Sequence, residues 1–479
     1  MTTEKDLIGL YEKWSGEKAA ACVMLAGTGS WRKYYRITGK KKRAIGVIND
    51  DLRENHAFLT FTRHFLELKL PVPRLYATGD AGKCYLLSDL GDVTLFGRLT
   101  DLRKSPGIFP AEAVGVYKKV ISWLPAFQVK GGIGLDYGAC YPRASFDRQS
   151  MLWDLSYFKY YFLKLAKIPF DEQRLENDFQ KLADLLSGQP GQGFLYRDFQ
   201  SRNIMLVEDE PFFIDYQGGR RGAFQYDIAS LLYDAKADIP EGIREVLLAF
   251  YLDELARTTP VDKAQFMDSY YGFVLIRIFQ ALGAYGFRGY YENKPHFLQS
   301  IPYAVENLEY LLQKGRVPSE LPALTSVLEY MTGSAALRRI TRPEGKLTVS
   351  LYSFSYRDRI PSDEAGNGGG FVFDCRALPN PGRLEEFQEK TGKDREVIEF
   401  LRKEPAVDEF LAAVFSLTEQ SVSTYLDRGF GSLMVSFGCT GGRHRSVYCA
   451  EELARHLKEK FGVTLRIIHT ELDKIKKQS

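Results

Sequence analysis

The spacing of apolar residues changes along the chain and divides it into stretches of different structure. Residues 25–88 contain short apolar runs typical of strands, together with one longer stretch whose apolar residues recur at helical spacing. The predicted strands are 34–38, 44–48 and 85–88, and the predicted helix is 52–68. This pattern predicts a small, mostly antiparallel sheet accompanied by one helix.

From residue 91 onward, apolar residues recur every three or four positions over several long stretches. The predicted helices are 111–127, 151–167, 175–186, 243–256, 270–284 and 321–331. A helical lobe therefore follows the sheet. We expect the first lobe to occupy residues 1–90 and the second to occupy residues 91–335.

The pattern changes again after residues 336–346, a charged segment with Pro343 and Gly345 that we interpret as a linker. The strands predicted beyond it are 347–351, 371–373, 433–437 and 463–468. The helices predicted there are 384–388, 396–403, 407–426 and 446–460. Alternating strands and helices are typical of an α/β domain, which we expect over residues 347–479. The predicted fold class is a bilobal α+β unit followed by a separate small α/β domain.

Composition narrows the functional classes. A chain of 479 residues is too long for one core of ordinary size, and 45% hydrophobic with 26% charged residues fits a globular protein. The net charge of +3 gives no field that demands nucleic acid. The opening residues mix charges with apolar side chains and resemble neither a secretory segment nor a membrane span, so we expect a cytoplasmic protein without a membrane partner. The six cysteines lack CxxC spacing, which argues against a disulfide framework and structural zinc.

The segment 196–234 carries the most informative motif. Asp198 and Asn203 lie five residues apart, and Asp215 follows at the end of an apolar strand, which is the layout of a phosphoryl-transfer site. Asp198 is predicted to accept the proton of an attacking hydroxyl, while Asn203 and Asp215 supply oxygen ligands to Mg²⁺ on the phosphates of ATP. Asp227, near a predicted helix start, is predicted to cap backbone donors and support the loop.

This segment resembles the aminoglycoside phosphotransferase family of kinase-like enzymes, whose usual strings are HGDxxxxN and a strand ending in IDxxD or IDxQ. Within that family it is most similar to the anomeric kinases of N-acetylmuramate and N-acetylglucosamine in cell-wall recycling, which carry HRDxxSRN, a DFQDA-like turn and YDLxSLLxD. The matching stretches here are 196–203, 215–218 and 226–234, and the resemblance spans residues 5–315. It implies a bilobal protein-kinase-like fold, ATP and Mg²⁺ as cofactors, and an amino sugar as acceptor.

Upstream, residues 26–36 read AGTGSWRKYYR. Glycines in such a loop allow backbone N–H groups to approach phosphates, although the pattern alone also fits a plain turn. Given the resemblance, the predicted ATP-binding residues of this stretch are Gly27, Thr28, Gly29, Ser30 and Lys33. Ser88 and Leu90 are expected at the hinge between the lobes, where backbone groups would hold adenine.

Two departures from the family pattern affect the site. Tyr196 replaces the usual histidine, so we expect different support for the catalytic loop. The strand 43–49 has no interior lysine, where related enzymes place one on the α- and β-phosphates. The candidates for that role are Arg32 and Lys33, with Glu54 on the predicted helix as partner.

A second motif, FGCTGGRHRSV at 437–447, lies between a predicted strand and a predicted helix. Its glycines permit close approach, and the N-terminus of a helix attracts anions. The predicted phosphate-binding residues are Thr440, Gly441, Gly442, His444, Arg445 and Ser446. Simple capping of the helix is the alternative.

This loop resembles the GCTGGxHRS motif of the C-terminal domain of the RNase adapter protein RapZ, over residues 347–472. Further matching stretches are 353–354, 373–381 and 391–394. The resemblance implies that the domain binds an amino-sugar phosphate. Cys439 and Arg445 also fit C-x5-R, the spacing of tyrosine-phosphatase-like enzymes, with Asp374 as a conceivable acid. Gly438 replaces the histidine usual there, which favours a structural cysteine.

We therefore predict an ATP-dependent kinase of N-acetylmuramate and/or N-acetylglucosamine, acting at the anomeric hydroxyl, with a C-terminal domain that binds a sugar-phosphate effector. Acceptor contacts are expected among Gln200, Arg202 and the helices near Tyr157. The alternative is a regulatory or RNA-binding adapter whose kinase-like domain senses a ligand. The intact catalytic motif argues against that alternative, and because the P-loop partner domain of RapZ is absent, RNA is the less favoured partner.

Overall fold

The computed structural model describes residues 3–25, 32–79, 82–103, 109–189, 191–292, 294–338, 347–363, 369–427 and 430–478. Internal contacts divide the chain into two compact units. The first comprises Met1–Glu292 with Ser300–Leu337, and the second comprises Asn293–Gln299 with Arg338–Ser479. Within the described residues no helix combines the length and the apolar character that crossing a membrane requires.

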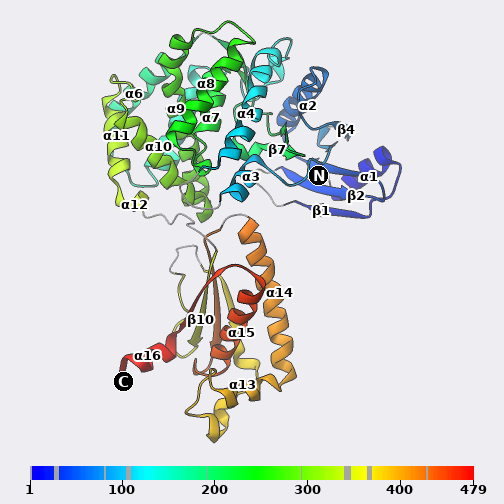
Figure 1. Ribbon diagram of the computed structural model, residues 1–479, viewed down its shortest axis with the longest axis vertical. Helices are drawn as coiled ribbons and strands as arrows, with labels where there is room; N and C mark the ends of the chain where they lie inside the picture. Colours follow the sequence, from blue (N-terminus) through cyan, green and yellow to red (C-terminus); the bar gives the residue numbers. More distant parts are fainter. Residues whose placement is uncertain are drawn as a thin grey trace. The chain divides into compact units, whose positions relative to one another are not determined.

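The first unit opens with a five-stranded antiparallel sheet in the order β1-β2-β3-β5-β4 (Figure 1). Its strands are β1 (Ala21–Met24), β2 (Lys33–Thr38), β3 (Arg43–Ile48), β4 (Leu75–Thr78) and β5 (Cys84–Leu87). Helices α1 (Glu4–Ser15) and α2 (Leu52–Glu67) accompany it. Leu7 and Tyr11 of α1 are buried in one apolar cluster with Ile37 and Leu86 of the sheet, so α1 covers one of its faces. The predicted strands and the helix over 52–68 are present; α1, β1 and β4 were not predicted.

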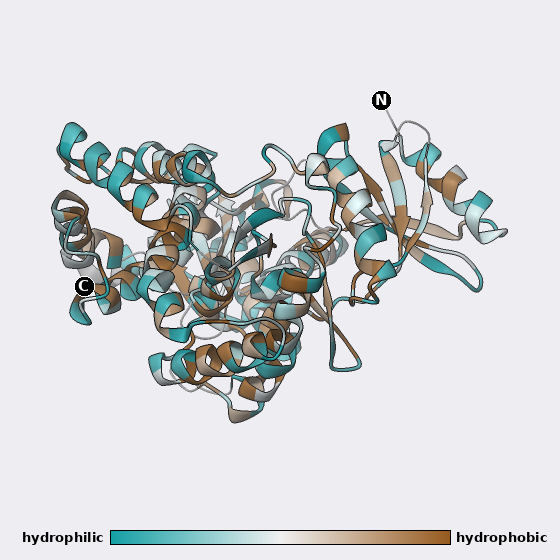
Figure 2. Ribbon diagram, turned by 90° about the horizontal axis from the view of Figure 1, so that it is seen from above, coloured by the Kyte–Doolittle hydropathy of each residue, from teal (hydrophilic) through white to brown (hydrophobic). Residues whose placement is uncertain are grey.

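The rest of the first unit is mostly helical, and the helices drawn in Figure 2 carry both hydrophobic and hydrophilic residues. These helices are α3 (Leu95–Leu102), α4 (Ala111–Pro125), α5 (Arg148–Phe158), α6 (Glu172–Leu186), α7 (Gln225–Leu232), α8 (Glu241–Ala256), α9 (Lys263–Gly286), α10 (Ile301–Gln313), α11 (Pro322–Gly333) and α12 (Ala335–Arg338). α9 packs against α5 and α7. At Gly286 the backbone of α9 closely approaches the π-helical turn Lys159–Leu163, because a Cβ atom there would lie 2.0 Å from the Tyr161 carbonyl oxygen. The helices predicted over 111–127 and 151–167 pass into single π-helical turns, Ala126–Lys130 and Lys159–Leu163.

Two small antiparallel strand pairs carry the segment with the Asp and Asn motif. β6 (Gln192–Leu195) pairs with β9 (Arg220–Ala223), and β7 (Ile204–Val207) pairs with β8 (Glu210–Phe213). The loop after β6 and the loop after β8 therefore emerge beside each other, because Ile214 donates its N–H to the Asn203 carbonyl at 3.1 Å.

The second unit is an α/β domain with a four-stranded parallel sheet in the order β11-β12-β10-β13. Its strands are β10 (Thr348–Ser355), β11 (Phe371–Asp374), β12 (Ser432–Cys439) and β13 (Thr464–His469), and its helices are α13 (Arg395–Arg402), α14 (Pro405–Asp427), α15 (Arg445–Lys460) and α16 (Thr470–Gln478). β12 is buried from Leu433 to Cys439, as expected for a central parallel strand covered on both faces. The helix predicted over 384–388 is wrong: only a 3-10 turn, Glu385–Phe387, forms there, directly after the Pro381–Arg383 turn.

Candidate functional site

The structure brings the three predicted residues of the catalytic motif together. Asn203 lies at the end of the loop that follows β6, and its Nδ2 donates to the Asp198 carbonyl oxygen at 2.9 Å. The same Nδ2 lies 3.4 Å from Oδ2 of Asp215, which follows β8. Asn203 thus connects the loop of Asp198 with Asp215.

This arrangement fits a divalent cation. The Asn203 amide directs its nitrogen at Asp198 and Asp215, so its oxygen is the atom available as a ligand. Burial raises the pKa of Asp215, the guanidinium of Arg32 lowers it, and the nearby Asp198 carboxylate raises it further. A divalent cation would offset this crowding of negative charge, and oxygen ligands suit Mg²⁺. In the described ranges no group of three or more His, Cys, Asp or Glu side chains forms a metal site, and this candidate set consists of one carboxylate and one carboxamide.

Asp227 supports the loop after β6, residues 196–203, which carries Asp198 and Asn203 and is called the catalytic loop. Asp227 is fully buried, and its two carboxylate oxygens accept the N–H groups of Tyr196 at 2.8 Å and of Arg197 at 3.0 Å. Burial raises the pKa of Asp227 to about 7, although these backbone hydrogen bonds lower it. The donors that Asp227 satisfies belong to the catalytic loop and not to the first turn of its own helix, α7.

Tyr196 and Arg197 hold the loop from two other sides. The Tyr196 hydroxyl donates to the Ile214 carbonyl at 2.6 Å, directly before Asp215. Arg197 has a left-handed backbone (φ 80°) and makes a two-pronged ion pair with Asp154 of α5, at 2.6 and 2.7 Å. The different support expected from Tyr196 is therefore a hydrogen bond to the strand end that presents Asp215.

Stacked aromatic rings join the sheet lobe to the site. Tyr85 of β5 lies 5.3 Å from Phe58 of α2, and Phe58 is stacked 5.0 Å from Tyr216, the residue after Asp215. The rings of Tyr216 and Tyr196 meet edge to face at 6.0 Å. These contacts tie the position of α2 to both loops of the site.

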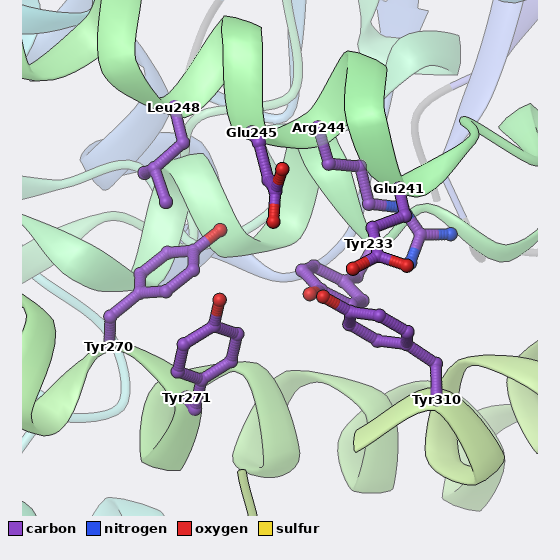
Figure 3. Close-up of a pocket in the computed structure, with 8 residues that line it drawn as sticks. All are labelled: Tyr233, Glu241, Arg244, Glu245, Leu248, Tyr270, Tyr271 and Tyr310. Carbon is purple, nitrogen blue, oxygen red and sulfur yellow. The ribbon is translucent and has the colours of Figure 1, made fainter. Parts of the chain in front are cut away.

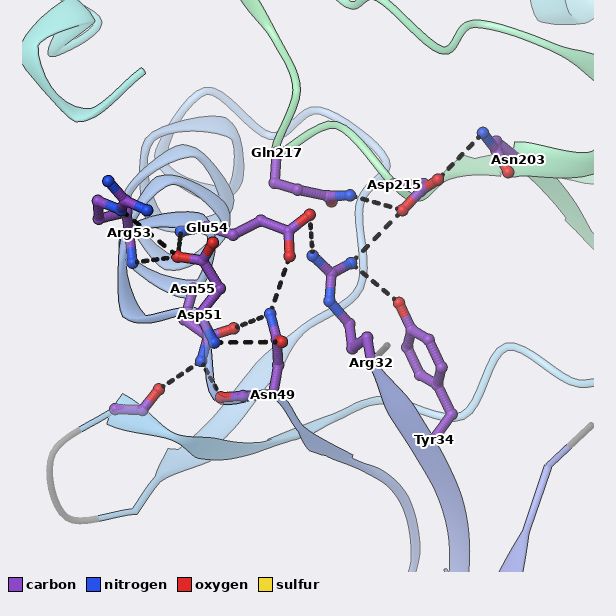
Figure 4. Close-up of polar contacts among 11 residues, drawn as sticks. Arg32, Tyr34, Asn49, Asp51, Arg53, Glu54, Asn55, Asn203, Asp215 and Gln217 are labelled. Atoms are coloured by element: carbon purple, nitrogen blue, oxygen red, sulfur yellow. Dashed lines mark hydrogen bonds and ion pairs between the residues drawn. The ribbon is translucent and has the colours of Figure 1, made fainter. Parts of the chain in front are cut away.

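A buried polar network connects the sheet lobe to Asp215 (Figure 4). The guanidinium of Arg32 places Nη2 3.0 Å from Glu54 Oε1 on α2 and Nη1 3.4 Å from Asp215 Oδ1. Asn49 holds the other Glu54 oxygen at 2.9 Å. Of the two cations proposed for the missing lysine, Arg32 is the one beside Glu54, whereas Lys33 is exposed on β2.

The other predicted nucleotide-binding residues divide into two groups. Gly27, Thr28, Gly29 and Ser30 lie outside the described residues. At the hinge, Ser88 donates its N–H to the Arg74 carbonyl and accepts the Arg74 N–H on its hydroxyl, both at 2.9 Å, and Leu90 follows within two residues. The Ser88 N–H is therefore already bonded to Arg74, the residue before β4.

The residues expected to contact the acceptor take part in packing. Gln200 accepts from Arg277 of α9 at 3.4 Å, and the Arg202 guanidinium lies 4.3 Å from the Phe96 ring centroid. Tyr157 packs against Phe287 just beyond the end of α9. Their contribution to acceptor binding stays a prediction.

A pocket in the helical lobe lies apart from this constellation (Figure 3). It is lined by Tyr233, Glu241, Arg244, Glu245, Leu248, Tyr270, Tyr271 and Tyr310. Within it the Arg244 guanidinium lies over the Tyr233 ring at 4.4 Å and donates to Asn307, outside the lining, at 2.6 Å. None of the predicted site residues lines it.

In the second unit, the motif at 437–447 turns from β12 into α15 at the carboxyl edge of the sheet. Thr440 and Gly441 are exposed, and no side chain caps the N-terminus of α15. Gly442 has φ 66°, and a Cβ atom there would lie 2.9 Å from the Ser355 nitrogen, so only glycine fits. This part of the loop offers exposed backbone at a helix N-terminus.

The side chains at the end of this loop turn inward. Arg445 is 4% exposed, and its Nη1 donates to the carbonyls of Arg376 and Leu378, both at 2.9 Å. His444 contacts the Phe387 carbonyl at 2.9 Å, and Ser446 is fully buried with its hydroxyl 3.1 Å from Cys439 Sγ. Arg445 and Ser446 therefore differ from the predicted phosphate cradle, because a buried guanidinium needs acceptors and finds them in the 376–378 turn.

The phosphatase alternative gains no support from this geometry. Cys439 is 2% exposed, and Arg445 is directed at carbonyl oxygens. The hydrogen bond from Arg376 lowers the pKa of Asp374, which disfavours a protonated general acid.

The sequence pattern did not predict a hydrogen-bonded chain of three side chains in the second unit, of which Ser353 and His469 are buried. Ser353 of β10 contacts His469 Nδ1 at 2.8 Å, and His469 Nε2 lies 3.0 Å from Glu451 of α15. Ser353 is fully buried, so this chain joins β10, β13 and α15 and does not present a nucleophile. Wide separation along the sequence left no local signal for it.

Family comparisons agree with both halves of this description. Residues 25–261 match the model of the phosphotransferase enzyme family, and residues 347–473 match the model of the RapZ C-terminal domain. The chain carries a phosphotransferase-family kinase domain followed by a RapZ C-terminal domain. The predicted fold class, a bilobal kinase-like unit followed by a separate small α/β domain, is confirmed, and the structure adds that the sheet of the second domain is parallel.

Individual relatives cover parts of the chain. A nucleotide-binding protein of Thermotoga neapolitana is 40% identical over 131 residues, which are 27% of this chain and 44% of that protein. The chain thus spans less than half the length of this curated relative. A choline kinase structure from Cryptosporidium parvum covers 68% of this chain and 100% of its own, with 12% identity and a TM-score of 0.46. An amicoumacin kinase, solved in complex with AMP-PNP and Ca²⁺, covers 66% of this chain and 90% of its own, with 12% identity and a TM-score of 0.38.

Proposed function

We propose that this protein is an ATP-dependent kinase that phosphorylates a hydroxyl group of a small molecule. The observation that carries this proposal is the Asn203 amide, which contacts the Asp198 carbonyl at 2.9 Å and the Asp215 carboxylate at 3.4 Å. The proposed base, Asp198, and the proposed oxygen ligands, Asn203 and Asp215, thus belong to adjoining loops. Contacts from Asp227, Tyr196 and the aromatic rings support these loops. The match of residues 25–261 to the phosphotransferase family supports the same chemistry.

In this reaction an acceptor oxygen forms a bond to the γ-phosphorus of ATP, and the bond between that phosphorus and the β–γ bridging oxygen breaks. ADP leaves with the bond's electron pair, and Asp198 accepts the proton of the acceptor hydroxyl. Mg²⁺, held by Asn203 and Asp215, would supply positive charge to the phosphate oxygens. Asp227 keeps Asp198 in position through the two backbone N–H groups that it binds.

As the acceptor we propose an amino sugar, N-acetylmuramate and/or N-acetylglucosamine, phosphorylated at the anomeric hydroxyl during cell-wall sugar recycling. The support is the likeness of residues 196–203, 215–218 and 226–234 to the strings of such kinases. The match of residues 347–473 to the RapZ C-terminal domain adds to this support only through the resemblance, which implies binding of an amino-sugar phosphate. We propose that its exposed Thr440–Gly441 backbone, at the uncapped start of α15, binds an amino-sugar phosphate that acts as an effector.

The competing function is a regulatory or RNA-binding adapter with an inactive kinase-like domain. Two departures from the family pattern suggest this alternative: Tyr196 replaces the usual histidine, and the strand 43–49 has no interior lysine. Tyr196 braces the Asp215 strand end, and Arg32 lies beside Glu54, so both departures have a structural counterpart within the site. The kinase is therefore the better supported function.

The product decides between the functions. The full-length protein is incubated with ATP, Mg²⁺ and each of a panel of N-acetylated and free amino sugars, and the products are examined by phosphorus NMR. We expect a phosphate on the anomeric carbon of N-acetylmuramate or N-acetylglucosamine. A phosphate at carbon six would overturn the anomeric assignment, and the absence of any phosphorylated sugar would overturn the amino-sugar acceptor.

A further inference from the structure

Arg32 is positioned to replace a lysine that the sheet does not provide. The strand β3 reads RAIGVI and has no lysine: Ala44 and Ile48 lie in the apolar cluster with α1, and the opposite face of the strand carries Ile45 and Val47. In the β2–β3 register Lys33 is opposite Ile48, which places Arg32 just beyond the end of β3 and beside Asn49. A cation reaches the site from β2 instead of β3.

We propose that Arg32 is the cation that binds the phosphates of the nucleotide, and that Glu54 is its positioning residue. This inference rests on the proposed kinase function. Arg32 is 4% exposed, and its Nη2 is held 3.0 Å from Glu54. Its Nη1 lies 3.4 Å from Asp215, the proposed metal ligand, so it adjoins the place where a metal and the phosphates would meet.

The rigidity of the network favours a fixed role for Glu54. Asn49 Nδ2 bonds Glu54 at 2.9 Å and Asn55 at 3.0 Å, and Asn55 Nδ2 returns to the Asn49 carbonyl at 2.8 Å. Asn49 and Asn55 are both buried. Hydrogen bonds between two buried amides restrict both to one arrangement, and Asn49 in turn fixes one oxygen of the partly exposed Glu54. Glu54 can therefore orient one edge of the Arg32 guanidinium.

The other edge is suited to exchange its partner. The contact of Nη1 with Asp215 at 3.4 Å is longer than that of Nη2 with Glu54 at 3.0 Å. With a divalent cation held at Asp215, the attraction between Nη1 and this carboxylate would weaken, and Nη1 could donate to a phosphate oxygen instead. The planar guanidinium can donate to Glu54 through Nη2 and to a phosphate through Nη1 at the same time, which a lysine ammonium does less well.

Direct binding measurements test this assignment without any acceptor. Calorimetry of the full-length protein with Mg²⁺ compares ADP and adenosine for the parent, Arg32→Met, Arg32→Lys, Lys33→Met and Lys41→Met. We expect Arg32→Met to weaken ADP by about 10- to 100-fold and to leave adenosine within about twofold. Arg32→Lys should lie between. Lys41, exposed at the turn between β2 and β3, is the control for charge alone, and Lys33→Met should resemble it.

Equal ADP affinity in Arg32→Met and the parent would overturn the proposal, and so would a loss in Lys33→Met as large as that in Arg32→Met. If Arg32→Met does not fold, Glu54→Gln serves instead: it should weaken ADP but not adenosine, and an unchanged ADP affinity would likewise overturn the assignment. The calorimetry contains no sugar and therefore tests Arg32 alone. Failure of the kinase proposal would appear in the separate phosphorus NMR experiment, as the absence of any phosphorylated product from a protein that binds ADP normally.

Discussion

The ion pair between Asp154 and Arg197 gives the sharpest stability prediction. Both side chains are largely buried, at 9% and 14% side-chain exposure, and they meet through two bonds of 2.6 and 2.7 Å. Arg197 also donates to the Tyr226 hydroxyl at 2.6 Å. Replacing Asp154 by Ala leaves the guanidinium buried with the tyrosine but without its carboxylate.

Breaking a buried pair by removing one partner costs about 3–5 kcal/mol, because the remaining charge is not compensated. The retained Tyr226 contact and access of water reduce this, so we expect Asp154→Ala to lower the free energy of unfolding by about 2–4 kcal/mol. Asp198 follows Arg197 directly, so a shift of the loop should also lower kcat by about 10- to 100-fold.

Urea unfolding measures the first effect, with Asp253→Ala as the control. Asp253 pairs with Lys263 at 2.6 Å, but both side chains are more than half exposed, so its loss should cost about 0–1 kcal/mol. The double variant Asp154→Leu with Arg197→Met should recover much of the stability, since both buried charges are gone. A cost for Asp154→Ala no larger than that for Asp253→Ala would refute the reasoning.

Two further predictions concern Asp227 and Gly442. The pKa of Asp227 is raised to about 7, above the roughly 3.9 of an unfolded aspartate, so the folded protein holds this proton more tightly and the stability from this group, full below about pH 4, is lost as pH rises through 7. Asp227→Asn removes this pH dependence of stability. The free energy of unfolding of the parent minus that of the variant, measured by urea titration, should therefore fall as pH rises from 4 to 7. A difference that stays constant with pH would contradict the prediction. In Gly442→Ala the new Cβ lies 2.9 Å from the Ser355 nitrogen at φ 66°, so this variant should lower the free energy of unfolding of the second unit by about 2–4 kcal/mol. Gly441→Ala, with no atom within 4 Å of its Cβ, should cost less than about 1 kcal/mol. Equal effects in thermal or urea unfolding would contradict this prediction.

The long elements could be predicted from the sequence because their apolar periodicity is local. The strands β2 and β3 and the helices α2, α6, α8, α11 and α15 lie within a few residues of their predicted bounds. β1 and β4 are only four residues each, too short for a period of two to be distinctive. The predicted helix over 384–388 was equally short, and the preceding turn at Pro381 limited it to a 3-10 turn.

The candidate site could be predicted where fixed spacing determines geometry. Asp198 and Asn203 lie on one short loop, and Asp215 ends the adjacent strand pair, so a local string was sufficient to bring them together. The choice between Arg32 and Lys33 could not be predicted from the sequence, because the strand register decides which of the two neighbours faces inward. The direction of Arg445 depends on carbonyls 67 and 69 residues away in sequence, which no local pattern reveals.

The central claim is that Asp198 takes the proton of the acceptor hydroxyl during phosphoryl transfer. The most direct test is the rate of ADP release from ATP with the sugar that gives product, measured for the parent, Asp198→Asn and Asp209→Asn. Asp209 is an exposed aspartate of the β7–β8 turn and serves as the matched control. The account predicts a loss of at least about 100-fold for Asp198→Asn and parent-like rates for Asp209→Asn. Parent-like release by Asp198→Asn would contradict it.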